Sequence, residues 1–433
     1  DFDANGELFF TMANGSHLRH VVMSESQLRG RRVGGVNTWK DIVDHRKLFP
    51  AHHDDRKSYL QIDFVGGFTA AAGSLIQSGA AWPKEFLGNH FVCEPTVNLV
   101  HRDVLTPAGV TFSASKPRQE EFLASSDLWF RPIHMRTGPD GAMYVLDFYN
   151  QAIVHNDPRG PKHGPTNAAV RPDRDKLHGR IWRVQHKNAA GQNAAIMPLR
   201  EDPVGLIQFL SHDASWQRRN AERLLREGPG TKILSALVEA LRFSKFSYTR
   251  LHALNLIHDL APGPAQRLAA VVMGLQDHNP AVRRRAAWLA GPVLADLPSA
   301  GILGRALVDL AETSTDARTR LGAMTSLGST ALGSQNLERL VALYPGLQDD
   351  WSRSALLGAL LTNPATSLAT LLRLSNEGQD CTSVVAELCR RIGERRDRDL
   401  TRETIQVLAQ TASDNGASVA ALTRLHETLG SRF

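Results

Sequence analysis

The residues best suited to chemistry are concentrated between positions 94 and 155. Carboxylates, histidines, arginines and a tyrosine occur there in the strings CEPTVNLVHRDVL, SSDLWFRP and DFYNQAIVHNDPRGP. Histidine titrates near neutrality, and the planar guanidinium of arginine pairs with carboxylates through two parallel hydrogen bonds. Such a set suits proton or hydride abstraction beside an anionic cofactor. The candidates are Glu94, Asn98, His101, Arg102, Asp127, Arg131, Asp147, Tyr149 and His155.

Within this set we expect catalytic or polar lining roles for His101, Glu94 and Asp147. We expect cofactor contacts from Arg131, Arg102, Asn98 and Tyr149. Several of these residues also have a structural interpretation, because ion pairs within a fold are commoner than sites. Glu94 could cap a strand before Pro95, and Arg102 could pair with Asp103 or a neighbouring acid. The alternation in VNLVHRDV makes His101 a candidate interior histidine.

Two stretches resemble metal sites, and neither is predicted to be one. The opening DFDANG matches the first half of an EF-hand loop, but its twelfth position is Met12 instead of a bidentate Glu. A β-prone run follows the glycine, which favours a turn before a strand. The tract HHDD at 52–55 places its ligands on adjacent loop residues, which rarely all reach one ion. We therefore predict no metal ligands.

Composition and motifs narrow the function classes. The three cysteines, Cys93, Cys381 and Cys389, form no CxxC or CxxCH, so the chain encodes neither a disulfide framework nor covalent haem c. The net charge of +6 is scattered over 433 residues, which argues against nucleic acid as a partner. No apolar run reaches the roughly 18 residues that a membrane-spanning helix needs, so no transmembrane segment is expected. Walker, GxSxG and HExxH motifs are absent.

Residues 1–187 have an all-β pattern of short apolar runs separated by Gly, Pro and Asn. A turn ending in glycine and followed by a strand recurs at 3–10, 106–113 and 138–145. Gly109 and Gly141 are roughly 32 residues apart, a pitch typical of one blade of a β-propeller. About 190 residues supply only three or four blades, so we expect a partial propeller whose N-terminal blades lie upstream. Residues 24–60 are interpreted as a long inserted loop.

Residues 200–433 change to a helical period, after a small polar linker at 188–199. Ala221, Ala253, Ala287 and Ala323 recur at steps of roughly 32 to 36 residues, the length of one helix-pair repeat, and an Asp-turn-Arg pattern recurs with them. Small residues at a repeating position let neighbouring helices pack closely. We predict an all-α HEAT/armadillo-like solenoid of about seven helix pairs, whose apolar stripes form its core and whose concave face offers a surface for a protein partner.

Residues 1–187 also carry a family resemblance. The strings FDANGELFFT, GGFTAAAG, WPKEFLGNHFVCEPTVNLVHRDVL, EEFLASSDLWFRP and TGPDGAMYVLDFYNQAIVHN look like a membrane-bound dehydrogenase family of planctomycetes and verrucomicrobia. Its members resemble soluble quinoprotein glucose and sorbosone dehydrogenases with a six-bladed propeller. They typically continue into HEAT-like repeats and often end in a c-type cytochrome module, for which this chain has no CxxCH.

The resemblance implies a cofactor, a location and a function. Pyrroloquinoline quinone with calcium would be the cofactor, and Arg131 of WFRP corresponds to a cofactor-binding arginine before the GPDGAMYV turn. The relatives' catalytic histidine falls in an early blade and is not assigned here. Membership implies export to an extracytoplasmic site, periplasmic or membrane-associated, with the signal peptide upstream. The expected function is oxidation of a carbohydrate or alcohol. The alternative is a non-catalytic carbohydrate- or protein-binding scaffold.

Overall fold

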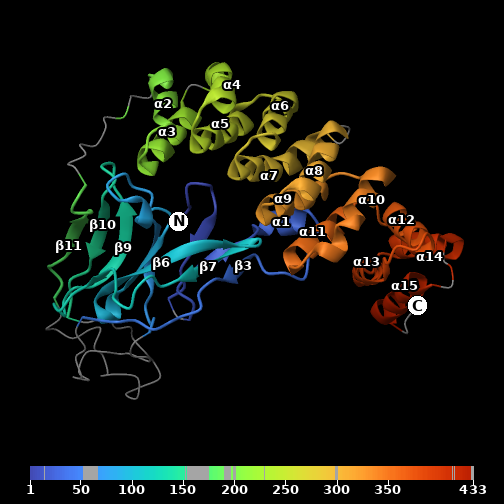
Figure 1. Cartoon of the computed structure of the whole chain (residues 1–433), viewed down its shortest axis with the longest axis horizontal. Helices are drawn as coiled ribbons and strands as arrows, with labels where there is room; N and C mark the ends of the chain where they lie inside the picture. The colour runs from blue at the N-terminus through green and yellow to red at the C-terminus, as the bar shows by residue number, and fades with distance from the viewer. Residues whose placement is uncertain are drawn as a thin grey trace, which may run out of the picture. The chain divides into compact units, whose positions relative to one another are not determined.

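The computed structural model divides into two compact units. It describes residues 1–13, 15–51, 67–151, 153, 175–189, 197, 201–228, 230–297, 301–411, 413 and 415–430. The first unit, here called the sheet unit, comprises Asp1–Val22 and Trp39–Ala236; the second, the helical unit, comprises Met23–Thr38 and Leu237–Phe433 (Figure 1). The predicted boundaries at 187 and 200 both fall inside the sheet unit, and most of the predicted linker lies outside the described residues.

Three small antiparallel sheets form the β-rich part of the sheet unit. The first has the order β1-β2-β3, with strands Leu8–Phe10, Arg19–Val21 and Trp39–Asp41. The second has the order β4-β5-β6-β7 with β8 beside β6, and its strands are Ala72–Ile76, His90–Glu94, Leu99–Ala108, Thr111–Ser115 and Leu123–Ala124. The third has the order β11-β10-β9, with strands Pro132–Thr137, Met143–Asp147 and Arg180–Val184 for β9, β10 and β11. The predicted β-rich start followed by helices is confirmed, but these sheets form no closed propeller within the described residues.

The three recurrent turns are confirmed as turns that precede strands. Gly6, Gly109 and Gly141 have φ values of 83°, 60° and 76°, a region that glycine adopts without steric cost. They stand before β1, β7 and β10. In the first turn, the Asp3 carboxylate accepts hydrogen bonds of 2.8 Å from two main-chain N–H groups. The opening DFDANG is therefore a turn braced by its own aspartate.

Fourteen helices follow in the described part of the chain. They are α2 Pro203–Phe209, α3 Ser215–Glu227, α4 Leu234–Phe243, α5 Ser247–Leu260, α6 Pro264–Leu275, α7 Pro280–Asp296, α8 Gly301–Thr313, α9 Ala317–Leu327, α10 Ser334–Ala342, α11 Asp350–Leu360, α12 Pro364–Asn376, α13 Thr382–Glu394, α14 Arg398–Thr411 and α15 Gly416–Leu429. In the helical unit, α7, α9, α11, α13 and α15 pack in succession, and α6, α8, α10, α12 and α14 form a second row (Figure 1). Two rows of alternating helices give this unit a solenoid-like arrangement.

The repeating sequence pattern has a direct structural reason. The four alanines that recur in register lie on α3, α5, α7 and α9, and each is 0% exposed. An arginine near the start of three helices donates to the main-chain carbonyl six residues before it, in two runs of the Asp-turn-Arg pattern and in the run SKFSYTR at 244–250, which has no aspartate. This occurs from Arg218 to His212, from Arg250 to Ser244 and from Arg283 to Asp277, each at 2.7 Å. These arginines satisfy carbonyls of the turn that precedes each of their helices.

A segment from the N-terminal region belongs to the helical unit. This segment, Met23–Thr38, is here called the strap; it leaves the first sheet after β2, contains helix α1 (Glu25–Gly30) and returns as β3. Ser354 Oγ on α11 accepts a hydrogen bond from the Gly34 N–H at 3.0 Å and donates to the Gly34 carbonyl at 2.7 Å. Trp351 Nε1 donates to the Asn37 carbonyl at 2.7 Å. The long inserted loop predicted at 24–60 thus contains helix α1 and strand β3, and its part up to Thr38 packs with the helical unit; 52–60 lie outside the described residues.

Glycines on the helices make room for the strap. A Cβ atom on Gly358 of α11 would collide with the Arg31 carbonyl oxygen. On Gly328, after α9, it would lie 3.0 Å from the same oxygen, and on Gly291 of α7 it would lie 2.9 Å from the Arg31 guanidinium. Three successive helices of one row thus accept the strap at positions where they lack a side chain.

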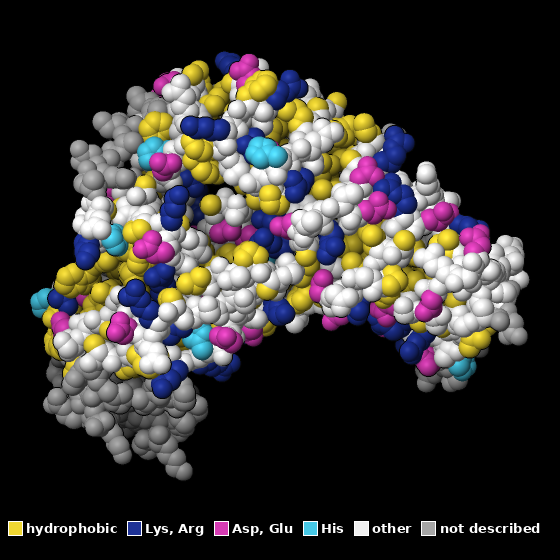
Figure 2. All heavy atoms as spheres, in the orientation of Figure 1, with side chains coloured by type: hydrophobic (Ala, Val, Ile, Leu, Met, Phe, Trp, Pro, Cys, Tyr) yellow, Lys and Arg dark blue, Asp and Glu magenta, His cyan; other side chains and the backbone are white. Residues whose placement is uncertain are grey.

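The surface charges and the helix lengths concern the predictions of scattered charge and of no transmembrane segment. Figure 2 shows Lys and Arg side chains interspersed with Asp and Glu over the visible face. Among the described residues, no single helix is long and apolar enough to cross a membrane. Helices α11 and α12 reach that length and composition only as a pair, and that pair is bent by 110°.

The glycine contacts generate a stability prediction. Gly358→Ala should lower the melting temperature, because the new methyl group meets a main-chain oxygen, and overpacking of this kind typically costs about 1–3 kcal/mol. Gly304→Ala on α8 is the matched control, because a Cβ atom there would have no neighbour within 4 Å and alanine favours the helix by roughly 0.5–1 kcal/mol. Thermal unfolding followed by circular dichroism measures both. Equal melting temperatures for the two variants would contradict the tight fit of the strap.

Candidate metal centre

Four side chains in the sheet unit converge on one point. His17, His45, His101 and Asp103, here called the His–Asp cluster, each offer a ligand atom, and these atoms all lie within 4.8 Å of one another. Asp103 Oδ1 lies 3.1 Å from Nε2 of both His45 and His101, and Asp103 Oδ2 lies 3.0 Å from His17 Nε2. The two Nε2 atoms of His45 and His101 are 3.2 Å apart. Three imidazole nitrogens and a carboxylate therefore meet at one place.

These separations match the edges of a metal coordination shell. Zinc binds imidazole nitrogen and carboxylate oxygen at about 2.0–2.2 Å, which places neighbouring tetrahedral ligands about 3.3 Å apart. The four separations of 3.0 to 3.2 Å in the cluster are close to that value. Imidazole with a single carboxylate suits zinc and other divalent transition metals, whereas calcium is bound almost wholly by oxygen.

Outer carboxylates fix the orientation of two of the histidines. Glu121 Oε2 lies 2.7 Å from His101 Nδ1, and Asp44 Oδ1 lies 2.8 Å from His45 Nδ1. A carboxylate on Nδ1 requires the proton on that nitrogen, so in the neutral ring Nε2 carries a lone pair. Both lone pairs then point toward the same place as the Asp103 carboxylate. Without a cation or additional protons at the centre, this arrangement is electrostatically unfavourable.

The electrostatics of the cluster follow from burial and from mutual hydrogen bonds. Burial alone would raise the pKa of Asp103, but hydrogen bonds from the surrounding histidines outweigh it and hold this pKa well below its usual range. Burial lowers the pKa of His17 to about 4, which keeps the ring neutral and able to ligate a metal. The hydrogen bond to Asp103 raises the pKa of His45. For His101, burial is outweighed by its bonds to Asp103 and Glu121, so its pKa is raised.

Different elements of the sheet unit bring the cluster together. His101 and Asp103 are two residues apart on β6, so both side chains project from the same face. His17 precedes β2, where the Leu18 carbonyl accepts a hydrogen bond from the Ile42 N–H. His45 follows β3, where Val43 forms a bridge with Ala114 of β7. The first sheet is thereby held against the second, with the cluster between them.

The cluster is buried on all sides except at His45. His17, His101 and Asp103 are each 0% exposed, whereas the His45 side chain is 19% exposed. Phe68 stacks on the His17 ring with centroids 4.0 Å apart. Because only His45 is partly exposed, solvent or a small molecule would reach a bound ion from the His45 side.

Of the predicted catalytic residues, the structure places His101 in the cluster and the other two elsewhere. Glu94, at the end of β5, is 0% exposed and its Oε2 accepts hydrogen bonds of 2.9 Å from the N–H groups of Thr69 and Ala70. Its Oε1 accepts from Thr96 N–H and from the Thr96 hydroxyl. Burial raises the pKa of Glu94, although these hydrogen bonds oppose the shift. Glu94 thus caps the short turn that follows its strand, as its structural interpretation expected.

Asp147 and Arg131 form a separate network. Asp147 accepts from the Arg131 N–H at 2.8 Å, from Arg180 Nε at 3.2 Å and from Trp182 Nε1 at 3.0 Å. The Arg131 side chain is buried, and its guanidinium donates to four main-chain carbonyls, those of Pro95, Thr96, Asn150 and Gln151. These contacts tie three segments of the sheet unit together, which is a structural role.

The remaining predicted residues are dispersed. Asn98 has φ 60° and donates to the Phe130 carbonyl at 2.6 Å, and the Arg180 guanidinium lies over the Tyr149 ring at 3.4 Å. Arg102 projects from the face of β6 opposite to Asp103, lies over the Phe86 ring at 4.1 Å and donates to the Glu85 carbonyl. The suggested Arg102–Asp103 pair is therefore wrong. Asp127 pairs with Arg180 at 3.2 Å. His155 and the HHDD tract at 52–55 lie outside the described residues.

The sequence pattern does not indicate His17, His45 or Asp103 as metal ligands. The spacing from His17 to His45 to His101 matches no ligand motif, and His20 stands as close to His17 in the sequence as a ligand pair would. The one available signal is His101-Arg-Asp103, because alternation along a strand places its first and third residues on one face. The strand around it gave no indication of which other histidines would reach that face.

The comparisons with known proteins identify a similar domain, but they indicate no activity. Residues 1–188 match the family model described as a domain of unknown function, DUF7133. No curated protein matches the chain. Similar solved structures include an engineered protein, with 18% identity and a TM-score of 0.30 over 52% of this chain and 97% of that one. Another is a structure of Kap95p with RanGDP, with 15% identity and a TM-score of 0.26 over 57% of this chain and 32% of that one. Residues 1–188 are thus similar to a domain of unknown function, and this family model does not cover residues 189–433.

Proposed function

We propose that the sheet unit is a metal-binding module that holds one divalent transition metal ion, with zinc as the first choice. The convergence of three imidazole nitrogens and one carboxylate carries the proposal. The two outer carboxylates on His101 and His45 support it, because ligating histidines commonly donate their other N–H to a carboxylate. A bound ion would act there as a Lewis acid on a hydroxyl, water or carbonyl group.

The protein residues would have distinct tasks in such a centre. Asp103 supplies the negative charge that offsets the charge of the ion, and the neutral ring of His17 supplies a lone pair. Glu121 holds the His101 ring in one tautomer and is itself paired with Lys116. His45 is the ligand nearest to solvent and defines the side from which a substrate would approach.

The dehydrogenase function implied by the family resemblance stays a second proposal. Its substrate would be a carbohydrate or an alcohol, its cofactor pyrroloquinoline quinone with calcium, and its location extracytoplasmic. Arg131 does not fit a clamp on the quinone carboxylates, because its guanidinium donates to main-chain carbonyls. The scaffold alternative, with the HEAT/armadillo-like helices as a surface for a protein partner, is supported by the two rows of helices.

Removing a cluster histidine should abolish metal binding. After loading with Zn²⁺ and exhaustive buffer exchange, the wild-type chain should retain about one equivalent, and His101→Ala should weaken binding by roughly 100-fold or more because one of four ligands is lost. His134→Ala on β9 is the control and should bind as the wild type does. Isothermal titration and metal analysis measure both. Equal affinities for His101→Ala and the wild type would refute the proposed centre.

Changing the carboxylate behind His101 should weaken the metal without removing a ligand. Glu121→Gln should lower affinity by about 10- to 100-fold, as is typical when an outer carboxylate is lost. In the Co²⁺-substituted protein, the visible absorption bands should shift, because the orientation of the His101 ring is no longer fixed. Glu120→Gln is the control, because Glu120 is the exposed neighbour of Glu121. Unchanged affinity and spectrum in Glu121→Gln would show that this contact does not tune a metal.

The dehydrogenase proposal has a separate test. Added pyrroloquinoline quinone and Ca²⁺ should produce sugar- or alcohol-dependent dye reduction if that function holds. A structural role for Arg131 predicts that Arg131→Lys lowers the melting temperature by the same amount with and without the quinone, because main-chain carbonyls lose their partner in either case. Arg136→Lys on β9 is the control. Absence of dye reduction over a broad panel of sugars and alcohols, together with absence of quinone binding, would refute the enzyme claim.

A further inference from the structure

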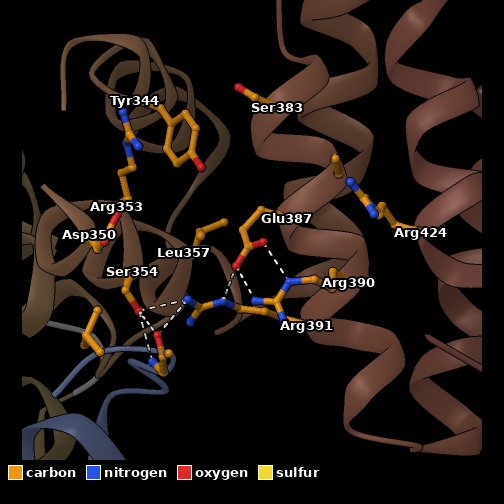
Figure 3. A pocket seen from close by; sticks show the side chains of 14 residues that line it. Tyr344, Asp350, Arg353, Ser354, Leu357, Ser383, Glu387, Arg390, Arg391 and Arg424 are labelled. Carbon is orange, nitrogen blue, oxygen red and sulfur yellow. Dashed lines mark hydrogen bonds and ion pairs between the residues drawn. The ribbon is translucent and has the colours of Figure 1, made fainter. Parts of the chain in front are cut away.

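The helical unit contains a pocket whose lining includes no residue of the His–Asp cluster. Its volume is about 530 Å³, which is within the range of small-molecule sites. The strap closes one side with Gly34, Gly35 and Val36, and the other walls come from α11, α13, α15 and the turn that contains Tyr344 (Figure 3). All of these elements belong to the helical unit.

One wall of the pocket carries an arginine that departs from the repeat pattern. In three earlier repeats the arginine uses a terminal guanidinium nitrogen to reach the carbonyl six residues before it. Arg353 reaches the equivalent carbonyl, that of Leu347, through Nε at 3.0 Å. Its two terminal nitrogens have no hydrogen-bond or ion-pair partner among the described residues. The side chain is thus anchored to the turn while its charged end remains available to the pocket.

Further donors surround the same space. Within the described residues, neither the Tyr344 hydroxyl nor the Ser383 hydroxyl has a hydrogen-bond partner, and both side chains line the pocket. Burial, followed by the charge of Glu387, raises the pKa of Tyr344, so its hydroxyl stays protonated and can donate. Arg424 lies across the pocket on α15 (Figure 3). It pairs with Glu427 in a contact whose two side chains are about half exposed.

The acceptors that line the pocket do not balance these donors. The carboxylate of Glu387 is already bound by Arg390 at 2.5 and 2.8 Å and by Arg391 at 3.1 Å (Figure 3). Arg391 also donates to Ser354 and to the Gly34 carbonyl, both at 2.9 Å. Its guanidinium is therefore already bonded to the strap and to α11. Asp350 is the other acid in the lining and is exposed at the start of α11. Four arginines and two acids line the pocket, and two of the arginines, Arg390 and Arg424, also pair with Glu394 and Glu427 outside the lining. Arg353 is the lining arginine without an ion-pair partner among the described residues.

We propose that this pocket binds a small molecule that carries an oxyanion group, either a phosphate or a carboxylate. Arg353 and Arg424 supply positive charge from opposite walls, and the hydroxyls of Tyr344 and Ser383 supply neutral donors between them. Planar guanidinium groups bind both kinds of oxyanion through charge-assisted hydrogen bonds. The strap forms part of the wall, so a ligand in this pocket would contact strap and helices together.

Titration of the full chain with inorganic pyrophosphate and, separately, with citrate tests the proposal and distinguishes the two oxyanions. Saturable binding of at least one of them is expected, with affinity reduced tenfold or more in Arg353→Gln and in Arg424→Gln. Tyr344→Phe should also weaken binding while the turn anchored by Arg353 remains intact. Arg223→Gln, on α3, is the matched control, because Arg223 forms an exposed helical ion pair with Glu227 much as Arg424 does with Glu427.

Either of two results would overturn the proposal. One is the absence of saturable binding of both anions up to millimolar concentration at low ionic strength. The other is binding that Arg353→Gln, Arg424→Gln and Tyr344→Phe all leave equal to that of Arg223→Gln. Prior removal of divalent metal with a chelator should leave the anion affinity unchanged, because the His–Asp cluster lies in the sheet unit.

Discussion

A buried negative charge constrains how the segments of the sheet unit come together. Asp103 is 0% exposed, and an isolated carboxylate in such a place would cost several kcal/mol. The fold compensates it with four histidines from four different segments, since His90 Nδ1 also lies 3.5 Å from Asp103 Oδ2. Segments that are far apart in the sequence must therefore arrive together if this charge is to be satisfied. The same requirement brings the proposed ligands within reach of one ion.

The helical unit depends on a different constraint, the close approach of two main chains. The strap buries Met23, Leu28 and Val33. Its main chain is held by hydrogen bonds: Ser354, Trp351 and Arg391 donate to its carbonyls, and Ser354 Oγ accepts from the Gly34 N–H. Such contacts require that the helices carry little bulk where the strap crosses them. The glycines on α7, α9 and α11 meet that condition, and the pocket lies where the strap then passes α13.

Local patterns in the sequence predicted the local structure well. The turns at Gly6, Gly109 and Gly141 could be predicted because positive φ and a following β-prone run are both properties of a few adjacent residues. The helical period and the alanine stripe were equally local. The arrangement of the sheets could not be predicted in this way, because strand pairing is decided by contacts between distant segments. The three sheets of the described residues form no closed propeller.

Of the four residues in the candidate site, the sequence predicted only His101, which lies on strand β6. His101 was selected as a titratable residue on a strand, but its partners at 17 and 45 are linked to it by tertiary packing alone. Adjacency in the sequence makes Asp103 one possible partner for Arg102, but adjacent residues of a strand face opposite ways. Arg131 and Glu94 were selected for their chemistry, and the structure gives both of them main-chain partners that no sequence pattern specifies.

The strap also has a consequence for the order in which the chain folds. Its contacts with the helices join residues 320 and 359 positions apart, such as Gly34 with Ser354 and Arg32 with Arg391. During synthesis from the N-terminus, the strap is made long before α11 and α13 exist. It must wait undocked while the repeats form, because contacts of such long range can be made only after both partners are present. Completion of the helical unit is therefore a late event in folding, and the pocket beside Gly34 appears only at that step.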